Sequence, residues 1–262
     1  MNIHRAARTV LLLVALSMLS ACGEGVDLGS MRTETRDVGS FDSISMKGTA
    51  RLEITVGDRE SLSIEGREKV ISRFSTDVHG DTLYIKSKRK DWITTGSSPR
   101  VTLKITVPRL VSLKLEGGND VRLTGFDGGE SKITVEGAAH IKANGRLDEL
   151  TVVMAGAGHA DLTNLVADEA KITVSGVGSV FVHPRNTLDA TMNGVGAILY
   201  TGNPRDVNTH MNGLGTIGRK EGKHEWNRDD DKDKLEKPVD PDSLQPEYDD
   251  KEEEAGETTE VI

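Results

Sequence analysis

The sequence predicts an all-β protein built as a parallel β-helix, in which short strands stack coil upon coil. Between residues 111 and 216, a unit of strand, glycine pair and strand recurs six times, with steps of 20, 19, 20, 18 and 19 residues between the first glycines. Apolar and polar residues alternate on both sides of each glycine, as in half-buried strands, and no helical period of 3.6 residues occurs there. A unit of about 19 residues is too short to bury its own apolar face, so neighbouring units must stack into one core.

The chain begins with a predicted lipoprotein signal peptide, residues 1–21. Arg5 and Arg8 precede an apolar stretch at 10–19 that is too short to span a bilayer permanently. The following Leu19-Ser20-Ala21-Cys22 resembles a bacterial lipobox, which predicts cleavage before Cys22 and its lipidation. The alternative is an ordinary cleavable signal followed by a coincidental cysteine.

Cys22 is the only cysteine of the chain, so no intrachain disulfide can form and the core alone must hold the domain together. Two or three acyl chains on it would anchor the protein firmly in a membrane. In a Gram-negative cell, Gly23 after the cysteine resembles the pattern for outer-membrane sorting. We therefore expect an exported, lipid-anchored protein whose residues 22–37 comprise the lipidated cysteine and a polar tether.

Residues 41–107 also alternate, but less evenly, and are expected to cap the first coil and shield its open edge. Turns at Val56-Gly57-Asp58 and at His79-Gly80-Asp81 suit β-hairpins. The longest irregular segment carries a candidate contact patch, in which a tryptophan stands beside three cations: Lys88, Arg89, Lys90 and Trp92. The alternative is a loop anchored by a partly buried tryptophan.

The recurring glycines are predicted to be structural. A Gly-x-Gly that cradles phosphate needs a helix N-terminus after it, whereas here strands flank every copy. Corners where the backbone needs positive φ, or where coils approach closely, explain all copies together. The residues concerned are Gly117, Gly137, Gly156, Gly158, Gly176, Gly178, Gly194, Gly196, Gly213 and Gly215.

Residues 38–220 resemble the GIN domain family (DUF2807), whose members carry the label of an auto-transporter adhesin head. The likeness rests on Phe41-Asp42-Ser43-Ile44, on residues 198–204 and above all on three glycine pairs, Gly176/Gly178, Gly194/Gly196 and Gly213/Gly215. Asn119 and Ala139 depart from the pattern, since they stand where the second glycine would be. The resemblance implies a right-handed parallel β-helix, here residues 38–226, and a cell-envelope setting. It brings no catalytic motif.

One column of the aligned repeats could hold a transition metal. Asp120, His140 and His159 follow their glycines by three residues, so the fold stacks them on successive coils, about 5 Å apart. The alternative is a surface ladder beside the corner.

Glu116 and Glu136 precede adjacent glycines and could act in general acid–base catalysis, but the outward position of their column favours side chains exposed to solvent. Asn193 and Asn212 of that column could form an asparagine ladder.

The last segment, residues 227–262, is predicted to be a disordered acidic tail. Residues 228–262 contain fifteen Asp and Glu against five Lys and Arg, with three prolines and few apolar side chains. The rest of the chain is therefore nearly neutral, which argues against a nucleic-acid partner. Aromatic residues make up only 3% of the chain, which argues against stacking platforms for bases or sugars.

These observations predict a lipid-anchored envelope protein whose β-helix is a non-catalytic binding, adhesion or structural module. Its partners would be the membrane and either a glycan or an envelope protein, and no cofactor is expected. Two alternatives remain open: a periplasmic accessory or scaffold lipoprotein, and a β-helical enzyme that acts on polysaccharide.

Overall fold

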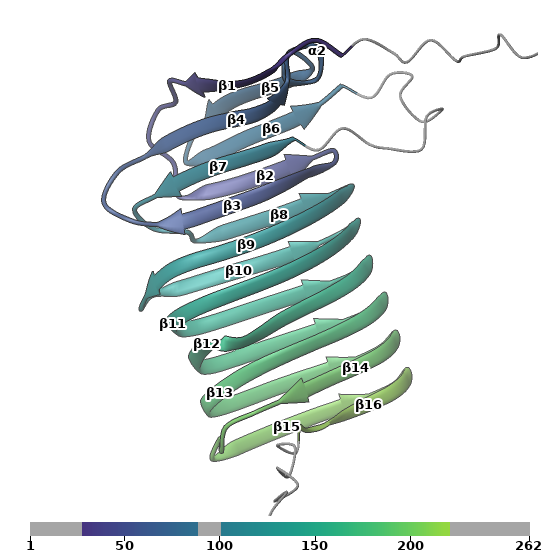
Figure 1. Cartoon of the computed structure of the whole chain (residues 1–262). Helices are drawn as coiled ribbons and strands as arrows, with labels where there is room; N and C mark the ends of the chain where they lie inside the picture. Colours follow the sequence, from purple (N-terminus) through teal and green to yellow (C-terminus); the bar gives the residue numbers. More distant parts are fainter. Residues whose placement is uncertain (1–27, 89–100, 221–262) are drawn as a thin grey trace, which may run out of the picture. The chain divides into compact units, whose positions relative to one another are not determined.

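The computed structural model describes residues 28–88 and 101–220, which fold into a β-solenoid with a curled mixed sheet (Figure 1). The predicted all-β class is therefore confirmed. Apart from the single-turn helix α2 (Glu68–Ile71), the elements are strands: β1 (Met31–Arg36), β2 (Ser43–Lys47), β3 (Ala50–Val56), β4 (Ser61–Arg67), β5 (Phe74–His79), β6 (Thr82–Ser87), β7 (Thr102–Val107), β8 (Ser112–Glu116), β9 (Gly118–Asp127), β10 (Glu130–Val135), β11 (Ala138–Met154), β12 (Ala157–Val174), β13 (Val177–Met192), β14 (Val195–Tyr200), β15 (Asp206–Met211) and β16 (Leu214–Arg219).

Each coil places one strand on each of two opposed faces, with a glycine corner between them. The front face contains β9, β14, β16 and the first halves of β11, β12 and β13, all paired in parallel. The back face contains β8, β10, β15 and the second halves of the same three long strands. Six successive glycine corners thus enclose about five turns.

The core lies between the two faces and is made of apolar columns. The back face contributes Leu113, Ile133, Val152, Ile172 and Ala190, which lie in register on successive coils and are almost completely buried. The front face contributes Val121, Ile141, Ala160, Val180 and Ile198. Burying one such aliphatic side chain contributes roughly 1.5–3 kcal/mol, so many short coils together supply the stability that no single coil could.

The corner glycines are packed backbone against backbone. A Cβ built on Gly176 would overlap the carbonyl oxygen of Gly156 and lie 2.6 Å from that of Ala155. The other first glycines collide in the same way with the corner of the preceding coil. Among them only Gly117 has a positive φ, of +102°. Close approach between coils, more than an unusual backbone conformation, therefore demands glycine in this column.

The N-terminal region extends both faces by two further pairs of strands. β2 and β3 meet at Gly48 and pair in parallel with β8 and β9, so Gly48 lies directly against the corner at Gly117. β6 and β7 pair in parallel with β2 and β3 on the other side. The β2–β3 coil is thus sandwiched between coils that follow it in the chain (Figure 1).

This topology corrects one predicted hairpin and confirms the other. The chain turns at His79-Gly80-Asp81 between β5 and β6, which pair antiparallel as predicted. At Val56-Gly57-Asp58 no hairpin forms, because β7 lies between β3 and β4 and pairs with both. The turn residues were correctly placed, but the partner of β3 comes from 51 residues further along the sequence, as in the pair of Arg51 and Thr102.

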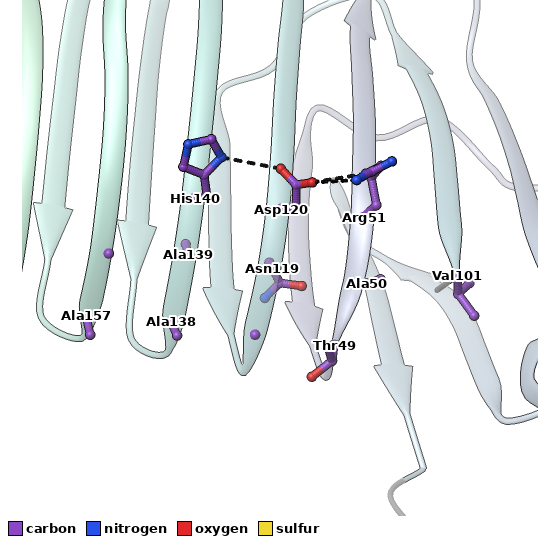
Figure 2. Close-up of a pocket in the computed structure, with 12 residues that line it drawn as sticks. Thr49, Ala50, Arg51, Val101, Asn119, Asp120, Ala138, Ala139, His140 and Ala157 are labelled. Atoms are coloured by element: carbon purple, nitrogen blue, oxygen red, sulfur yellow. Dashed lines mark hydrogen bonds and ion pairs between the residues drawn. The ribbon is translucent and has the colours of Figure 1, made fainter. Parts of the chain in front are cut away.

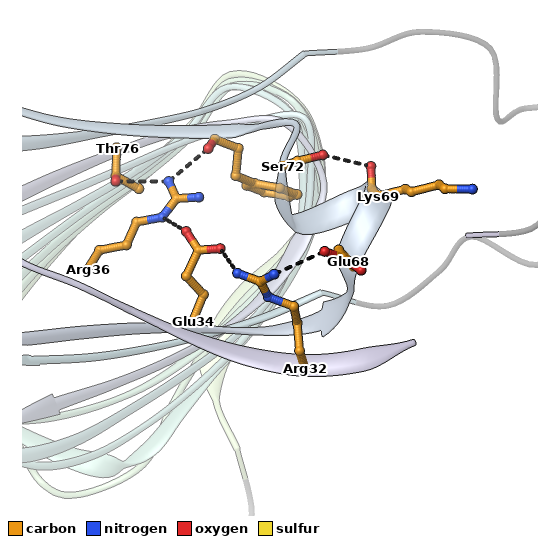
Figure 3. A network of polar contacts seen from close by, with 8 residues as sticks. Arg32, Glu34, Arg36, Glu68, Lys69, Ser72 and Thr76 are labelled. Atoms are coloured by element: carbon orange, nitrogen blue, oxygen red, sulfur yellow. Dashed lines mark hydrogen bonds and ion pairs between the residues drawn. The ribbon is translucent and has the colours of Figure 1, made fainter. Parts of the chain in front are cut away.

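An antiparallel cap closes this end, as the sequence predicts, and it begins earlier than expected. β1 lies within the segment assigned to the tether, yet it pairs with β4 along six residues. Arg32, Glu34, Arg36 and Glu68 form a chain of ion pairs at 3.0–3.1 Å across β1 and α2 (Figure 3). Charged side chains on an edge strand discourage pairing with other molecules.

The opposite end of the described solenoid carries no such charged network. β15 pairs only with β13, and β16 only with β14. Val207 and Met211 are therefore exposed, although their counterparts on the preceding coil, Leu188 and Met192, are buried. The predicted signal peptide, the first part of the tether (residues 22–27, with Cys22) and the acidic tail lie outside the described residues. Among the helices of the described part, none has the length and apolarity to cross a membrane.

Candidate ligand-binding site

A polar ladder crosses the outer surface of the front face. Arg51, Asp120, His140, His159 and Ser179 lie in direct register on β3, β9, β11, β12 and β13. Each follows its corner by three residues, so the regular coil fixes their alignment. The sequence predicts the four later members from the glycine spacing.

The first three residues of the ladder are joined by their side chains. The Nε and Nη2 atoms of Arg51 each lie 3.0 Å from Oδ2 of Asp120, and Nδ1 of His140 lies 3.5 Å from Oδ1 (Figure 2). Partial burial works to raise the pKa of Asp120, but the hydrogen bonds from Arg51 and His140 outweigh it and the pKa is lowered. Asp120 is therefore held as a carboxylate, with one oxygen bound by Arg51 and the other beside His140.

The two histidines of the predicted metal site are stacked. Their rings are nearly parallel, at 11°, with centroids 5.6 Å apart. Nδ1 of His159 instead contacts the Ser179 hydroxyl at 2.8 Å, and its ring packs against Phe181. Within residues 28–88 and 101–220, no group of three His, Cys, Asp or Glu is placed to hold a metal ion. The column thus has the geometry of a surface ladder.

A groove of about 580 Å³ lies between this ladder and the corners (Figure 2). Its surface is built from small residues, because Gly118, Ala138 and Ala157 occupy one column of β9, β11 and β12. The same column carries Val177, Val195 and Leu214 on the later coils, all exposed. The groove therefore lies on the coils whose residue in this column is glycine or alanine, and ends where the column continues with valine and leucine.

A second, smaller hollow of about 230 Å³ adjoins the groove. The two share Arg51, Asp120 and His140, which form the ridge between them. The hollow is lined in addition by the charged residues Glu53, Arg122 and Lys142 and by Val121. One side of the ridge thus presents apolar surface and the other presents charge.

The paired carboxylates on the back face do not resemble a catalytic dyad. Glu116 accepts from Lys47 at 3.2 Å and from Lys114 at 3.3 Å, and Glu136 accepts from Lys114 at 3.0 Å. Lys47, followed by Lys114, lowers the pKa of Glu116. A general acid needs the opposite shift. Three coils further along the same column, the asparagine ladder is confirmed, since Nδ2 of Asn212 donates to Oδ1 of Asn193 at 3.0 Å.

The departure from the glycine pattern at residue 119 creates an unusual buried group. Asn119 is 6% exposed, and neither atom of its side-chain amide has a hydrogen-bond partner. Its register neighbours on β3 and β11 are Ala50 and Ala139.

Of the predicted contact patch only Lys88, exposed at the end of β6, belongs to the described residues; Arg89, Lys90 and Trp92 lie outside them.

Sequence reasoning missed Arg51, although a signal for it was present. Gly48 is preceded by Ile44 and Met46 and followed by Leu52 and Ile54, which is the spacing of the later repeats. Aligning Gly48 with the six repeats would have placed Arg51 at the head of the ladder. The long insertion before Gly117 hid this relation.

Comparison with known proteins finds one family model, described as "Putative auto-transporter adhesin, head GIN domain", which matches residues 40–204. A crystal structure of a putative adhesin from Bacteroides fragilis is 20% identical, with a TM-score of 0.55 over 73% of this chain and 97% of that one. A putative adhesin from Parabacteroides distasonis is 17% identical, with a TM-score of 0.42 over 73% and 98% of the two chains. No curated protein sequence matches. At these identities the first structure shows a shared fold.

Proposed function

The chain belongs to the GIN-domain family, described as "Putative auto-transporter adhesin, head GIN domain", and from that premise we propose that it is a non-catalytic binding module of the cell envelope. In this proposal the solenoid engages a partner outside the membrane in which Cys22 is anchored by lipid. The lipobox-like Leu19-Ser20-Ala21-Cys22 supports the anchor.

The observation that carries the binding role is the groove with its polar ridge on the front face. Its residues project from strands of a hydrogen-bonded stack, which holds them rigidly before any ligand arrives. A preformed site loses little conformational entropy on binding. A volume of about 580 Å³ lies within the usual range of small-ligand sites.

The absence of catalysis is part of the proposal and is supported by the contacts of the three carboxylates that the sequence singles out. Glu116 and Glu136 are each paired with lysine, and Asp120 is engaged by Arg51 and His140. Replacing both glutamates by glutamine should therefore leave ligand binding unchanged. Loss of a polysaccharide-cleaving activity in that folded double variant would favour the enzyme alternative.

Protease treatment of intact cells tests the setting, with an antibody against the β-solenoid as readout. We expect digestion in intact cells, and release of a Cys22→Ala variant from the membrane fraction. Protection in intact cells with digestion only after lysis would overturn the surface role and favour a periplasmic scaffold. Retention of Cys22→Ala in the membrane would overturn the lipid anchor.

A further inference from the structure

Two adjacent cations of the front face lie between two acidic residues, Glu53 in register with Arg122 and Asp161 in register with Lys142. Arg122 on β9 and Lys142 on β11 lie in direct register, and both are exposed. In the described part of the chain, neither makes an ion pair within 4.0 Å. Like charges placed directly opposite each other across strands are unfavourable. An anion bound between them would remove that repulsion.

The acidic residues that line the hollow are fewer than the basic ones. Asp120 is engaged by Arg51 at 3.0 Å and by His140 at 3.5 Å. Asp161, next in register to Lys142, accepts from the Thr163 hydroxyl at 2.7 Å and does not line the hollow. Glu53 is the other acidic residue of the lining, which sets Arg51, Arg122 and Lys142 against Asp120 and Glu53. The lining therefore carries one net positive charge before His140 is counted.

The groove on the other side of the ridge has a different chemistry. Methyl groups of Ala138, Ala157 and Thr49 and the backbone of Gly118 form an uncharged, shallow surface. The strands there are paired on both sides, so an extended peptide could not add to a sheet edge. Recognition must use side chains and surface shape, which suits a ring with apolar C–H faces.

We propose that groove and hollow together bind an acidic glycan, with a sugar ring over the small residues and its carboxylate, sulfate or phosphate group between Arg122 and Lys142. This rests on the proposed binding function and names the ligand class for it. The ridge residue Arg51 is held by Asp120, and Asp120 and His140 supply further polar atoms for sugar hydroxyl groups.

The test is a binding measurement with paired probes that differ only in charge. Trigalacturonate would be compared with its methyl ester, sulfated lactose with lactose, and mannose phosphate with mannose, using the soluble Cys22→Ala protein. We expect at least one acidic probe to bind about tenfold more tightly than its neutral partner. Inorganic sulfate alone should bind more weakly than that probe, because it cannot use the groove.

Two variants locate the site. Arg122→Gln with Lys142→Gln should lower affinity for the acidic probe about tenfold or more, whereas Lys132→Gln with Lys171→Gln removes the same charge from the back face and should not. Ala157→Leu fills the groove, and Leu214 in the same column shows that leucine is accommodated there. It should weaken the glycan and leave sulfate binding unchanged.

Three results would overturn the inference: equal affinity for acidic and neutral probes, equal affinity for sulfate alone, or equal loss in the back-face control. A protein that binds neutral glycans only would refute the ligand class and leave the binding function standing. Binding to none of the probes would refute the acidic-glycan site, and the surface digestion would then decide the broader function separately.

Discussion

Replacing Gly176 by alanine tests whether the corner glycines are required by contact between coils. Gly176 has no positive φ, so a new Cβ would be unfavourable only because of its neighbours. It would lie 2.6 Å from the carbonyl oxygen of Ala155 and overlap that of Gly156. An ordinary contact needs about 3.4 Å, so the two coils would have to separate by at least about 0.8 Å.

That separation acts on three backbone hydrogen bonds. The N–H groups of Ser175 and Gly176 both donate to Met154, at 2.8 and 3.1 Å, and that of Val177 donates to Gly156 at 3.0 Å. Lengthening each by about 0.8 Å takes it beyond useful hydrogen-bond distance. At roughly 1 kcal/mol each, the free energy of unfolding should fall by about 3 kcal/mol.

Urea unfolding followed by circular dichroism would measure this loss. Gly39→Ala is the matched control, because its Cβ would meet nothing within 4 Å and its φ is not positive. Its stability should stay the same or rise by about 0.4–1 kcal/mol. If Gly176→Ala unfolded within about 0.5 kcal/mol of the Gly39→Ala control, the steric argument for the whole column would fail.

Three further predictions address the cap, the core and the back face. Arg36→Ala should lower the free energy of unfolding by about 1–3 kcal/mol, because the Arg36 side chain is only 17% exposed and donates to the Phe74 carbonyl at 2.7 Å. Arg32 is more exposed, so Arg32→Ala should cost less than about 1 kcal/mol. Equal losses in urea unfolding would refute this difference. Asn119→Ala should leave stability unchanged or raise it by about 1 kcal/mol, since two unsatisfied buried atoms are removed, and a clear drop in melting temperature would contradict it. Lys47→Ala should raise the pKa of Glu116 towards its ordinary value, which an NMR titration would measure; an unchanged pKa would refute the pairing. Because the pKa of Glu116 is lowered in the folded protein, the ionised carboxylate stabilises the fold at pH values above its unfolded-state pKa. That stabilisation is lost as the pH falls through the folded-state pKa.

The regular part of the fold could be predicted because one short-range rule repeats there. The spacing from Gly117 to Gly213 determines which residues stack, and this placed Asp120, His140, His159 and Ser179 in one column correctly. The contacts within the column could not be predicted in the same way. Whether the two histidines converge on an ion or stack depends on side-chain torsions, which a spacing does not specify.

The N-terminal part was harder because its pairing is long-range. The spacing around Gly48 matches that of the later repeats, but 69 residues separate it from Gly117, and nothing local indicates that β7 separates β3 from β4. β1 escaped notice for another reason: Met31–Arg36 has no alternation of apolar and polar residues, because it is a charged edge strand paired on one side only. Hydrophobic periodicity identifies strands that face a core and misses those that protect one.

The sandwiched position of the β2–β3 coil has a consequence for the order of folding. This coil is synthesised first, but it needs β6–β7 on one side and β8–β9 on the other before its edges are paired. Contacts between distant residues form slowly because the intervening chain must first be closed into a loop. The coils from β10 to β14 each need only the previous 20 or so residues and can therefore form a nucleus among themselves. Pulse-labelled hydrogen exchange should accordingly protect β12 before β3. Folding would then proceed from the middle of the chain towards its N-terminal coil, opposite to the direction of synthesis. The strands β2 and β3 would remain unpaired until the middle of the sequence has been synthesised.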